Sequence, residues 1–418
     1  MNPITASKAM IYLFSYAPTA WDAKKFGFDI LHSSGVNLHV LDLSALVSTR
    51  SETGAAPITA AYIEKITSYE LLEKIILKYK DNSIFIDNIN GLSGFQWAGR
   101  QIFKLFKKYN VQYYVLEVGS LPILATEKKQ TLAQKLKKAL QLKKLFIYLK
   151  WRLGKATVNY QWRHYDSYQL PAKVFTGNSE TRQHYLAKYN LTHNDVVSIH
   201  SFDYDRFLDY QRNGQPLDLR DRKICVFVDQ MLATHPDFGK IHFSPVTVGN
   251  YFPALNQFFD YIENTLGLTV VIAACPRVNY ENTPELFGGR AVFYYQAVEL
   301  VAQSALVLMH TSTAVSFPVL FNKPIIFMKT KEMANAPSYL NLLENMAAEL
   351  KLPTICIDNE KAIQQITPES FARWPTNYDE YKFKYVMSKD AGDNNTWEIL
   401  MAEFYGQSTT ENSTEAYA

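Results

Sequence analysis

Hydroxyl and imidazole side chains gather in one short stretch, His310-Thr311-Ser312-Thr313, directly after the apolar run 305–309. Such an order is typical of a buried strand followed by a helix, whose first N–H groups have no partner within the helix. Ser and Thr hydroxyls cap helix starts, while the free N–H groups and the helix dipole favour negative charge. The stretch therefore predicts an anion site, and a simple helix cap is the alternative.

The carboxylate residue Asp229 lies near the end of another apolar run, KICVFVDQ at 223–230. Gln230, His235 and Asp237 add polar groups close behind it. Side chains at the carboxyl ends of parallel strands line the usual ligand site of an open α/β sheet. We expect Asp229 to take part in chemistry there, and a carboxylate that merely caps the following turn is the alternative.

Two arginines flank the neighbouring apolar runs. Arg277 follows the run at 269–274, and Arg290 precedes the run at 291–295. A guanidinium at a strand end can bind a carboxylate or phosphate through two parallel hydrogen bonds, although most arginines are simply solvated. Tyr280 lies between them and could stack on a base or sugar. Together with Asp229 and the hydroxyl turn, Arg277 predicts a site for a phosphate-bearing ligand with a second acidic group.

These residues depend on an alternation of strand-like and helix-like segments, which indicates parallel sheets with covered faces. The expected strands lie at 10–16, 37–43, 83–88, 112–118, 223–230, 269–276, 291–295, 305–309 and 353–358, with a further strand after Lys323-Pro324. The segment 173–189 repeats the strand-helix pattern, with Ser179 as the expected helix cap. The expected helices lie at 24–33, 60–79, 98–108, 179–189, 252–266 and 297–304.

A chain of 418 residues is too long for one ordinary core, so we expect two domains. The fold class is α/β, with two doubly wound, Rossmann-like domains facing a cleft. The first domain takes 1–215 and the second 216–375, with a polar linker at 205–222. A helical segment at 376–405 and a disordered polar tail at 406–418 complete the chain.

Composition narrows the class of protein further. A hydrophobic fraction of 47% and a net charge of +3 are those of a globular protein with no overall field for nucleic acid. The cysteines Cys225, Cys275 and Cys356 are far apart, which suits reduced thiols and is not zinc spacing. The apolar run at 10–16 is too short for a signal peptide, and no run is long enough to span a membrane. We expect a cytoplasmic or membrane-peripheral protein.

One segment is strongly basic. Residues 127–155 hold ten Lys and Arg against one Glu, with Leu132, Leu136 and Leu140 on one helical face. A basic, amphipathic helix is typical of segments that lie on anionic lipid. We favour that interpretation over nucleic-acid binding and over an ordinary solvated helix.

Longer stretches resemble a known family. ELVAQSALVLMHTSTAVSFPVLFNKPIIF at 299–327 resembles the C-terminal, donor-binding domain of GT-B glycosyltransferases that build bacterial surface polysaccharides. FTGNSETRQHYLAKYN at 175–190 and SIHSFDYDRF at 198–207 resemble the crossing between their two domains. The specific likeness covers roughly residues 170–330, and the earlier part shares only the α/β rhythm.

The His-Thr-Ser-Thr turn resembles the signatures of transferases that use CMP-activated ulosonic acids, above all the retaining β-Kdo transferases of O-antigen and capsule synthesis. This resemblance implies an acceptor-side first domain, a donor-binding second domain, and CMP-β-Kdo as donor without metal or other cofactor. It also implies a cytoplasmic enzyme, peripheral at the inner membrane, whose acceptor is a polysaccharide or lipid-linked glycan, such as lipopolysaccharide O-antigen or capsule.

The resemblance assigns roles to individual residues. Asp229 is the nucleophile that forms a covalent sugar adduct, Arg277 pairs with the ulosonate carboxylate, and the turn holds the CMP phosphate through His310, Thr311, Ser312 and Thr313. Cys275 departs from the pattern, because a histidine is expected before Pro276 and Arg277. The residue that activates the acceptor stays open among His235, Asp237 and Glu117.

Two other functions remain as alternatives. An inverting transferase of sialic or other nonulosonic acids would use Asp229 or Asp237 as a general base. A non-catalytic subunit would bind a sugar nucleotide without turning it over. Asp203-Tyr204-Asp205 matches the Asp-x-Asp pattern of metal-dependent sugar transferases, but its position away from a strand end favours a structural turn.

Overall fold

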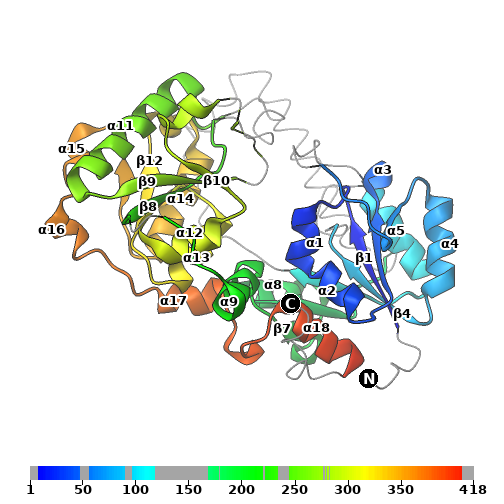
Figure 1. Cartoon of the computed structure of the whole chain (residues 1–418). Helices are drawn as coiled ribbons and strands as arrows, with labels where there is room; N and C mark the ends of the chain where they lie inside the picture. Colours follow the sequence, from blue (N-terminus) through cyan, green and yellow to red (C-terminus); the bar gives the residue numbers. More distant parts are fainter. Residues whose placement is uncertain are drawn as a thin grey trace, which may run out of the picture.

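The computed structural model describes residues 8–47, 56–89, 97–117, 168–177, 179–219, 222–233, 244–275, 278, 280–281 and 283–406. These residues form two α/β domains, each built on one parallel sheet (Figure 1). The expected fold class, with two doubly wound domains, is therefore confirmed.

The first sheet has seven strands in the order β3-β2-β1-β4-β5-β6-β7, and every pairing is parallel. Its strands are β1 (Ala9–Phe14), β2 (Leu38–Asp42), β3 (Ile63–Lys65), β4 (Ser83–Asp87), β5 (Tyr113–Glu117), β6 (Lys173–Thr176) and β7 (Val196–Ser198). Its helices are α1 (Ala20–Phe26), α2 (Phe28–Ser33), α3 (Ser44–Val47), α4 (Tyr69–Tyr79), α5 (Trp97–Lys108), α8 (Ser179–Tyr189) and η2 (His193–Asp195).

Both faces of this sheet are covered, because successive side chains of β1 enter different cores. Ile11 and Leu13 pack with α4, α5 and α8 on one face. Met10, Tyr12 and Phe14 pack with α1 and α2 on the other. A buried parallel strand needs apolar residues on both sides, which explains the continuous apolar run of β1.

The second sheet has six strands, all parallel, in the order β10-β9-β8-β11-β12-β13. Its strands are β8 (Ile224–Val228), β9 (Thr269–Ala274), β10 (Val292–Tyr294), β11 (Ser304–Met309), β12 (Ile325–Lys329) and β13 (Thr354–Cys356). Its helices include α11 (Val248–Leu266), η3 (Pro284–Phe287), α12 (Ala297–Gln303), η4 (Thr313–Val315), α13 (Ser316–Leu320), η5 (Lys331–Asn335), α14 (Pro337–Glu349), α15 (Glu360–Ile363) and α16 (Pro368–Phe371).

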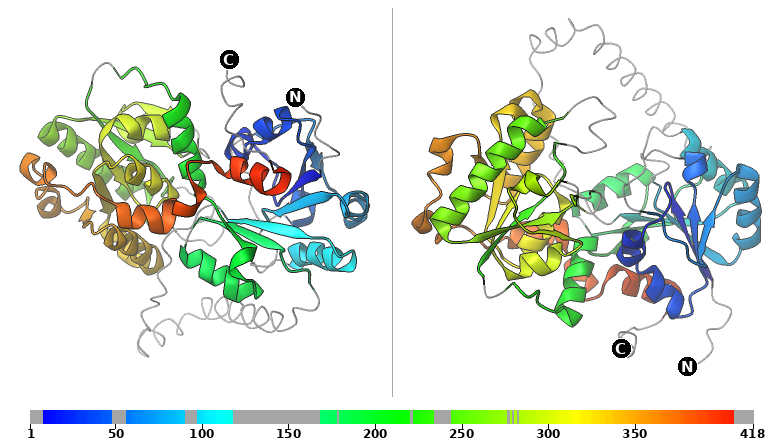
Figure 2. Two further views of the ribbon diagram at one scale, coloured as in Figure 1. Left: turned by 90° about the horizontal axis from the view of Figure 1, so that it is seen from below. Right: turned by 45° about the horizontal axis from the view of Figure 1, so that its top comes forward.

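The chain crosses between the domains twice. The helix α9 (Phe202–Asn213) leads from the first sheet to the second. The returning segment contains α17 (Asp379–Tyr381), a π-helical turn η6 (Lys382–Val386), η7 (Lys389–Ala391) and α18 (Thr396–Tyr405). Leu400 and Met401 of α18 are buried in the core of the first domain with Tyr12 and Phe14. The last helix of the chain therefore packs on the first sheet (Figure 2).

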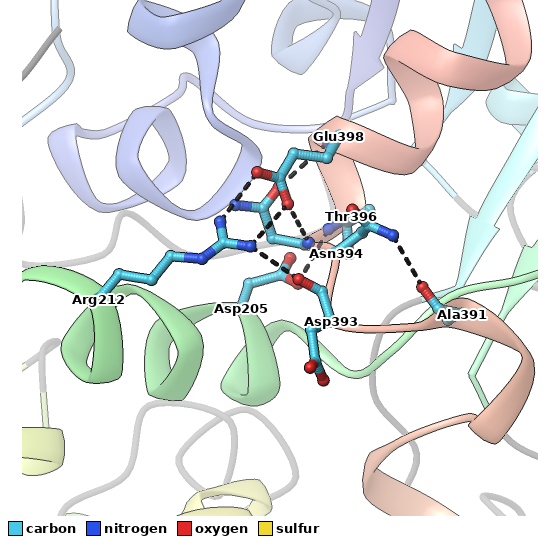
Figure 3. Close-up of polar contacts among 8 residues, drawn as sticks. Asp205, Arg212, Ala391, Asp393, Asn394, Thr396 and Glu398 are labelled. Carbon is cyan, nitrogen blue, oxygen red and sulfur yellow. Dashed lines mark hydrogen bonds and ion pairs between the residues drawn. The ribbon is translucent and has the colours of Figure 1, made fainter. Parts of the chain in front are cut away.

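A network of polar contacts ties α18 to α9 (Figure 3). Arg212 of α9 pairs with Glu398 of α18, with Nη1–Oε1 at 2.8 Å, and donates to the carbonyl of Asp393 at 2.7 Å. Asp205 accepts a hydrogen bond from the backbone N–H of Thr396 at 2.9 Å. Asp205 and Glu398 are both buried, so each carboxylate needs these partners.

Three sequence predictions are wrong in part. The helix expected at 60–79 begins only at Tyr69, because the hydroxyl of Ser68 caps it and 63–65 pairs with β2 instead. The helix expected at 24–33 breaks at Gly27, whose φ of 64° is the left-handed conformation that glycine adopts readily.

The segment expected as a linker at 205–222 does lie between the two sheets, but its first half belongs to the helix α9. The hydroxyl of Ser201 caps this helix, and Phe202 and Leu208 bury its apolar side. The Asp203–Asp205 motif lies in its first turn. A structural role for the motif is correct, although the element is a helix rather than a turn.

Among the described residues, no helix has the length and apolar character needed to cross a bilayer. The basic segment 127–155 and the tail beyond Gly406 lie outside the described residues.

Candidate functional site

Asp229 directly follows β8, a central strand of the second sheet, at the carboxyl edge of that sheet. Its carboxylate is 7% exposed and has three hydrogen-bond donors around it. The backbone N–H of Met231 donates to Oδ1 at 3.0 Å, while the N–H of Cys275 and the hydroxyl of Tyr280 donate to Oδ2 at 3.4 and 2.8 Å. Burial raises the pKa of Asp229, and these donors oppose the shift.

The backbone beside Asp229 has an uncommon conformation. Met231 has a φ of 55° and Tyr295, directly after β10, has a φ of 61°. Both are bulky non-glycine residues, for which the left-handed region is strained. Strain of this kind gathers at functional sites when the surrounding structure enforces it. Both residues lie at the carboxyl edge of the second sheet.

The hydroxyl turn follows β11, the neighbour of β8, and therefore lies beside Asp229. Gln230 links the two strand ends, because its Nε2 donates to the hydroxyl of Thr311 at 3.2 Å and its Oε1 accepts from the hydroxyl of Tyr339 at 3.1 Å. Ser312 caps the helical segment that starts at Thr313, accepting from the N–H of Ala314 at 3.2 Å. The strand, turn and capped helix expected here are all present.

His310 is completely buried, and both of its ring nitrogens have partners. Nδ1 lies 2.6 Å from the carbonyl oxygen of Met328, which can only accept, so Nδ1 carries the proton. Nε2 then accepts from the hydroxyl of Tyr251 at 2.8 Å. Burial lowers the pKa of His310 to about 4, so the ring is neutral near pH 7. In this structure His310 holds the strand ends together and presents no nitrogen to an anion, unlike the contact expected from the sequence.

Tyr280 and Arg290 have structural partners. Tyr280 is buried against Asp229 rather than exposed for stacking, and its own N–H donates to the hydroxyl of Tyr294 at 2.7 Å. Arg290 bridges to Asp260 and Glu263 of α11. Its guanidinium therefore fixes the loop before β10 onto α11, and it is neither simply solvated nor directed at a ligand.

The remaining residues expected in the site are not all described by the structure. His235, Asp237 and Arg277 are outside the described residues. Glu117, the remaining candidate for acceptor activation, is in the first domain at the end of β5. Within the part of the chain that the structure describes, no group of three His, Cys, Asp or Glu residues could hold a metal ion.

The sequence did not reveal Tyr251 and Tyr339 as members of the site. Tyr251 comes from α11 and reaches His310, while Tyr339 comes from α14 and reaches Gln230. With 27 tyrosines in the chain, no local signal separates these two from the others. The packing of α11 and α14 beside the strand ends places these two tyrosines in the site.

Comparison with known proteins finds no matching family model and no matching curated protein. Solved structures do match. The wall teichoic acid polymerase TagF, as its H548A variant, is similar with a TM-score of 0.52 and 11% identity over 93% of this chain and 86% of that chain.

Two further matches have lower TM-scores. The complex of MnaA from S. aureus with UDP gives 0.47 at 13% identity, over 97% of this chain and 98% of that one. The UDP-GlcNAc 2-epimerase of Neisseria meningitidis bound to UDP-GlcNAc gives 0.48 at 11% identity, over 94% and 99%.

The likeness to TagF agrees with the geometry of the chain itself. Two parallel sheets, a helical crossing at α9 and a last helix that returns to the first domain are all present. At 11% identity the comparison concerns the fold alone. The chain has the two-domain α/β architecture of the GT-B fold.

Proposed function

We propose that the protein is a glycosyltransferase that uses a nucleotide-activated sugar, with CMP-β-Kdo as donor, and transfers the sugar to a surface glycan with retention. The observation that carries the proposal is the fixed carboxylate of Asp229 beside the hydroxyl turn at 311–313. Ligands of open parallel sheets bind at the carboxyl ends of the strands, and these groups lie there.

Asp229 suits the role of nucleophile because its orientation is set before substrate binds. Three donors hold its two oxygens in place, so little freedom is lost when it attacks. In the first step a carboxylate oxygen bonds to the anomeric carbon, and the bond from that carbon to the phosphate oxygen breaks with its electron pair. In the second step the acceptor oxygen bonds to the same carbon, the bond to Asp229 breaks, and the acceptor loses its proton.

The turn suits the departing phosphate. Ser312 is partly exposed and Thr313 is exposed, so their hydroxyl groups can donate hydrogen bonds to a phosphate. Donors that are already ordered stabilise the charge that grows on a leaving phosphate. The neutral His310 holds this turn from beneath through Met328 and Tyr251, so its part is positioning.

The direct test is the mass of the intact protein after incubation with CMP-β-Kdo. We expect a covalent sugar adduct on the native chain and none on Asp229→Asn, which keeps the shape of the side chain but loses its charge. Asp379→Asn in α17 is the matched control and should still form the adduct. CMP release with inverted product and without an adduct would favour the inverting mechanism, and absence of any turnover would refute the proposal.

The nucleotide is tested separately by thermal shift with CMP, UMP, UDP and GDP. CMP should give the largest rise in melting temperature, because a ligand that binds only the native state stabilises it. A larger rise with UDP or GDP would reject the CMP donor while leaving the transferase activity open to test with the corresponding sugar nucleotide.

We also propose that the basic segment 127–155 binds anionic lipid, which would bring the first domain to a membrane-bound acceptor. Replacing Lys137, Lys138, Lys143 and Lys144 by Glu should release the protein from vesicles that contain phosphatidylglycerol. Equal partitioning of the native and substituted chains would refute this.

A further inference from the structure

The carboxyl edge of the first sheet carries a polar cluster of its own. Asp87, Glu117 and Thr176 end the adjacent strands β4, β5 and β6. Glu117 lies opposite Thr176 in the strand register, and the hydroxyl of Thr176 donates to its Oε2 at 3.0 Å. Asp87 accepts from the backbone N–H of Ile89 at 2.8 Å. Three neighbouring strand ends thus present two carboxylates and a hydroxyl.

A lysine from α8 completes the cluster. The ammonium of Lys188 lies over the rings of Tyr189 and Tyr185, at 4.7 and 5.3 Å from their centres. Burial lowers the pKa of Lys188 to about 8, and the charges of Asp87 and Glu117 oppose that shift. Two carboxylates and one ammonium are therefore held together at the margin of a buried core.

The pKa of Glu117 is raised above its ordinary value. Burial raises its pKa, while the hydroxyls of Thr176 and Thr181 and the charge of Lys188 lower it. Glu117 and Lys188 are both partly buried, so neither side chain is fully enclosed by the core. A carboxylate whose pKa is moved toward neutrality is well suited to accept a proton during catalysis.

The two domains contact each other near the carboxyl edges of their sheets. Trp21 lies in α1, which follows β1, and Tyr295 directly follows β10 of the second sheet. Their ring centres are 6.2 Å apart. This contact brings the segment after β1 to the segment after β10, and in Figure 1 α1 lies on the side of the first domain that faces the second.

We infer that Glu117 is the catalytic base, which binds a hydroxyl group of the acceptor glycan and removes its proton. This inference rests on the proposed transferase function and concerns its second step. The acceptor O–H proton passes to a carboxylate oxygen of Glu117 as the acceptor oxygen bonds to the anomeric carbon, and the bond to Asp229 breaks. Glu117 then returns the proton to water.

The chemistry of the cluster fits a sugar rather than a phosphate. Its carboxylates and hydroxyls accept and donate hydrogen bonds to sugar hydroxyls, whereas two carboxylates repel an anion. Lys188 is a positioning residue, because its charge favours the ionised form of Glu117 that a base needs.

Water serves as the probe acceptor, because it can hydrolyse the sugar adduct on Asp229. Intact mass spectrometry follows formation and decay of the adduct after a pulse of CMP-β-Kdo. We expect Glu117→Gln to form the adduct and lose it about 100-fold more slowly than the native chain, a typical effect of removing a general base. Gln keeps an acceptor for the hydroxyl of Thr176, so the fold should be retained.

The pH dependence of adduct decay tests Lys188. Removing its charge in Lys188→Met raises the pKa of Glu117, so the fall in decay rate toward acid should move to higher pH. If Lys188 were purely structural, Lys188→Met would change the melting temperature but leave the pH dependence of adduct decay unchanged. Glu403→Gln, in an ion pair with Lys173 in the same domain, is the matched control and should decay at the native rate.

Decay of the adduct at the native rate in Glu117→Gln would overturn the role of Glu117. The absence of any adduct in the native chain would instead refute the proposed function and, with it, this inference.

Discussion

Arg212 is the residue whose loss should most clearly uncouple α18 from the crossing helix α9. Its guanidinium meets the carboxylate of Glu398 at 2.8 and 3.4 Å, and Glu398 is only 5% exposed. Arg212→Met keeps much of the apolar stem and leaves that carboxylate without its cation. Glu398 retains the N–H of Asn395 at 2.7 Å, so the start of α18 stays capped.

The expected loss follows from this burial. Breaking a buried ion pair by removing one partner costs about 3–5 kcal/mol. Because the side chain of Arg212 is 34% exposed, water screens part of the pair, and we expect about 2–3 kcal/mol. For a domain of this size that corresponds to a fall of about 5–10 °C in melting temperature.

Urea unfolding of the single variants Arg212→Met and Glu398→Gln and of the double variant measures the coupling. The double variant should be more stable than the sum of the two single losses predicts, because it has no buried charge to leave unpaired. Faster hydrogen exchange in α18 should accompany the loss in Arg212→Met. Arg373→Met removes an exposed arginine and should change little. A coupling energy below about 0.5 kcal/mol would refute the reasoning.

Three further outcomes follow from the second domain and the crossing. Tyr280→Phe removes a donor that lowers the pKa of Asp229, so that pKa should rise and the acid limb of adduct formation should move to higher pH; an unmoved limb would contradict the contact. Because burial lowers the pKa of His310 to about 4, the neutral ring contributes about 3 kcal/mol of stability, which is fully present above about pH 6.5 and is lost as the pH falls toward 4. The melting temperature of His310→Asn should therefore fall less between pH 7 and pH 5 than that of the native chain. The guanidinium of Arg206 lies over the rings of Trp21 and Phe317, 4.6 and 5.1 Å from their centres. Arg206→Ala should therefore lower the unfolding free energy by about 1–2 kcal/mol and change the fluorescence of Trp21. If this contact contributes nothing to stability, neither quantity will change.

The sequence was a good guide to the strands because buried parallel strands are short, continuous apolar runs. The runs at 10–16 and 223–230 correspond to β1 and β8 within two residues at each end. Polar residues directly after such runs, including Asp229 and Thr311, were therefore correctly placed at strand ends. The positions of Asp229 and Thr311 could be predicted because they depend only on the sequence of residues within each short segment.

What the sequence could not give depends on contacts between distant segments. The return of α18 to the first sheet joins residues about 190 apart, as in the pairing of Asp205 with Thr396, and no local pattern announces it. The role of His310 is similar, because Met328 and Tyr251 occupy its two nitrogens from other elements. A histidine after a strand resembles a ligand contact until its partners are known.

The two carboxyl edges divide the chemistry by their charges. The edge of the second sheet holds one buried carboxylate, Asp229, surrounded by hydroxyl and N–H donors, an arrangement that can orient a nucleophile and receive a departing anion. The edge of the first sheet holds Asp87 and Glu117 with one ammonium, which repels anions and suits hydroxyl groups. Because a double displacement needs its nucleophile and its base at different stages, separate domains can hold each group in its own environment. Substituting Asp229 should therefore abolish adduct formation, whereas substituting Glu117 should only prolong the life of the adduct.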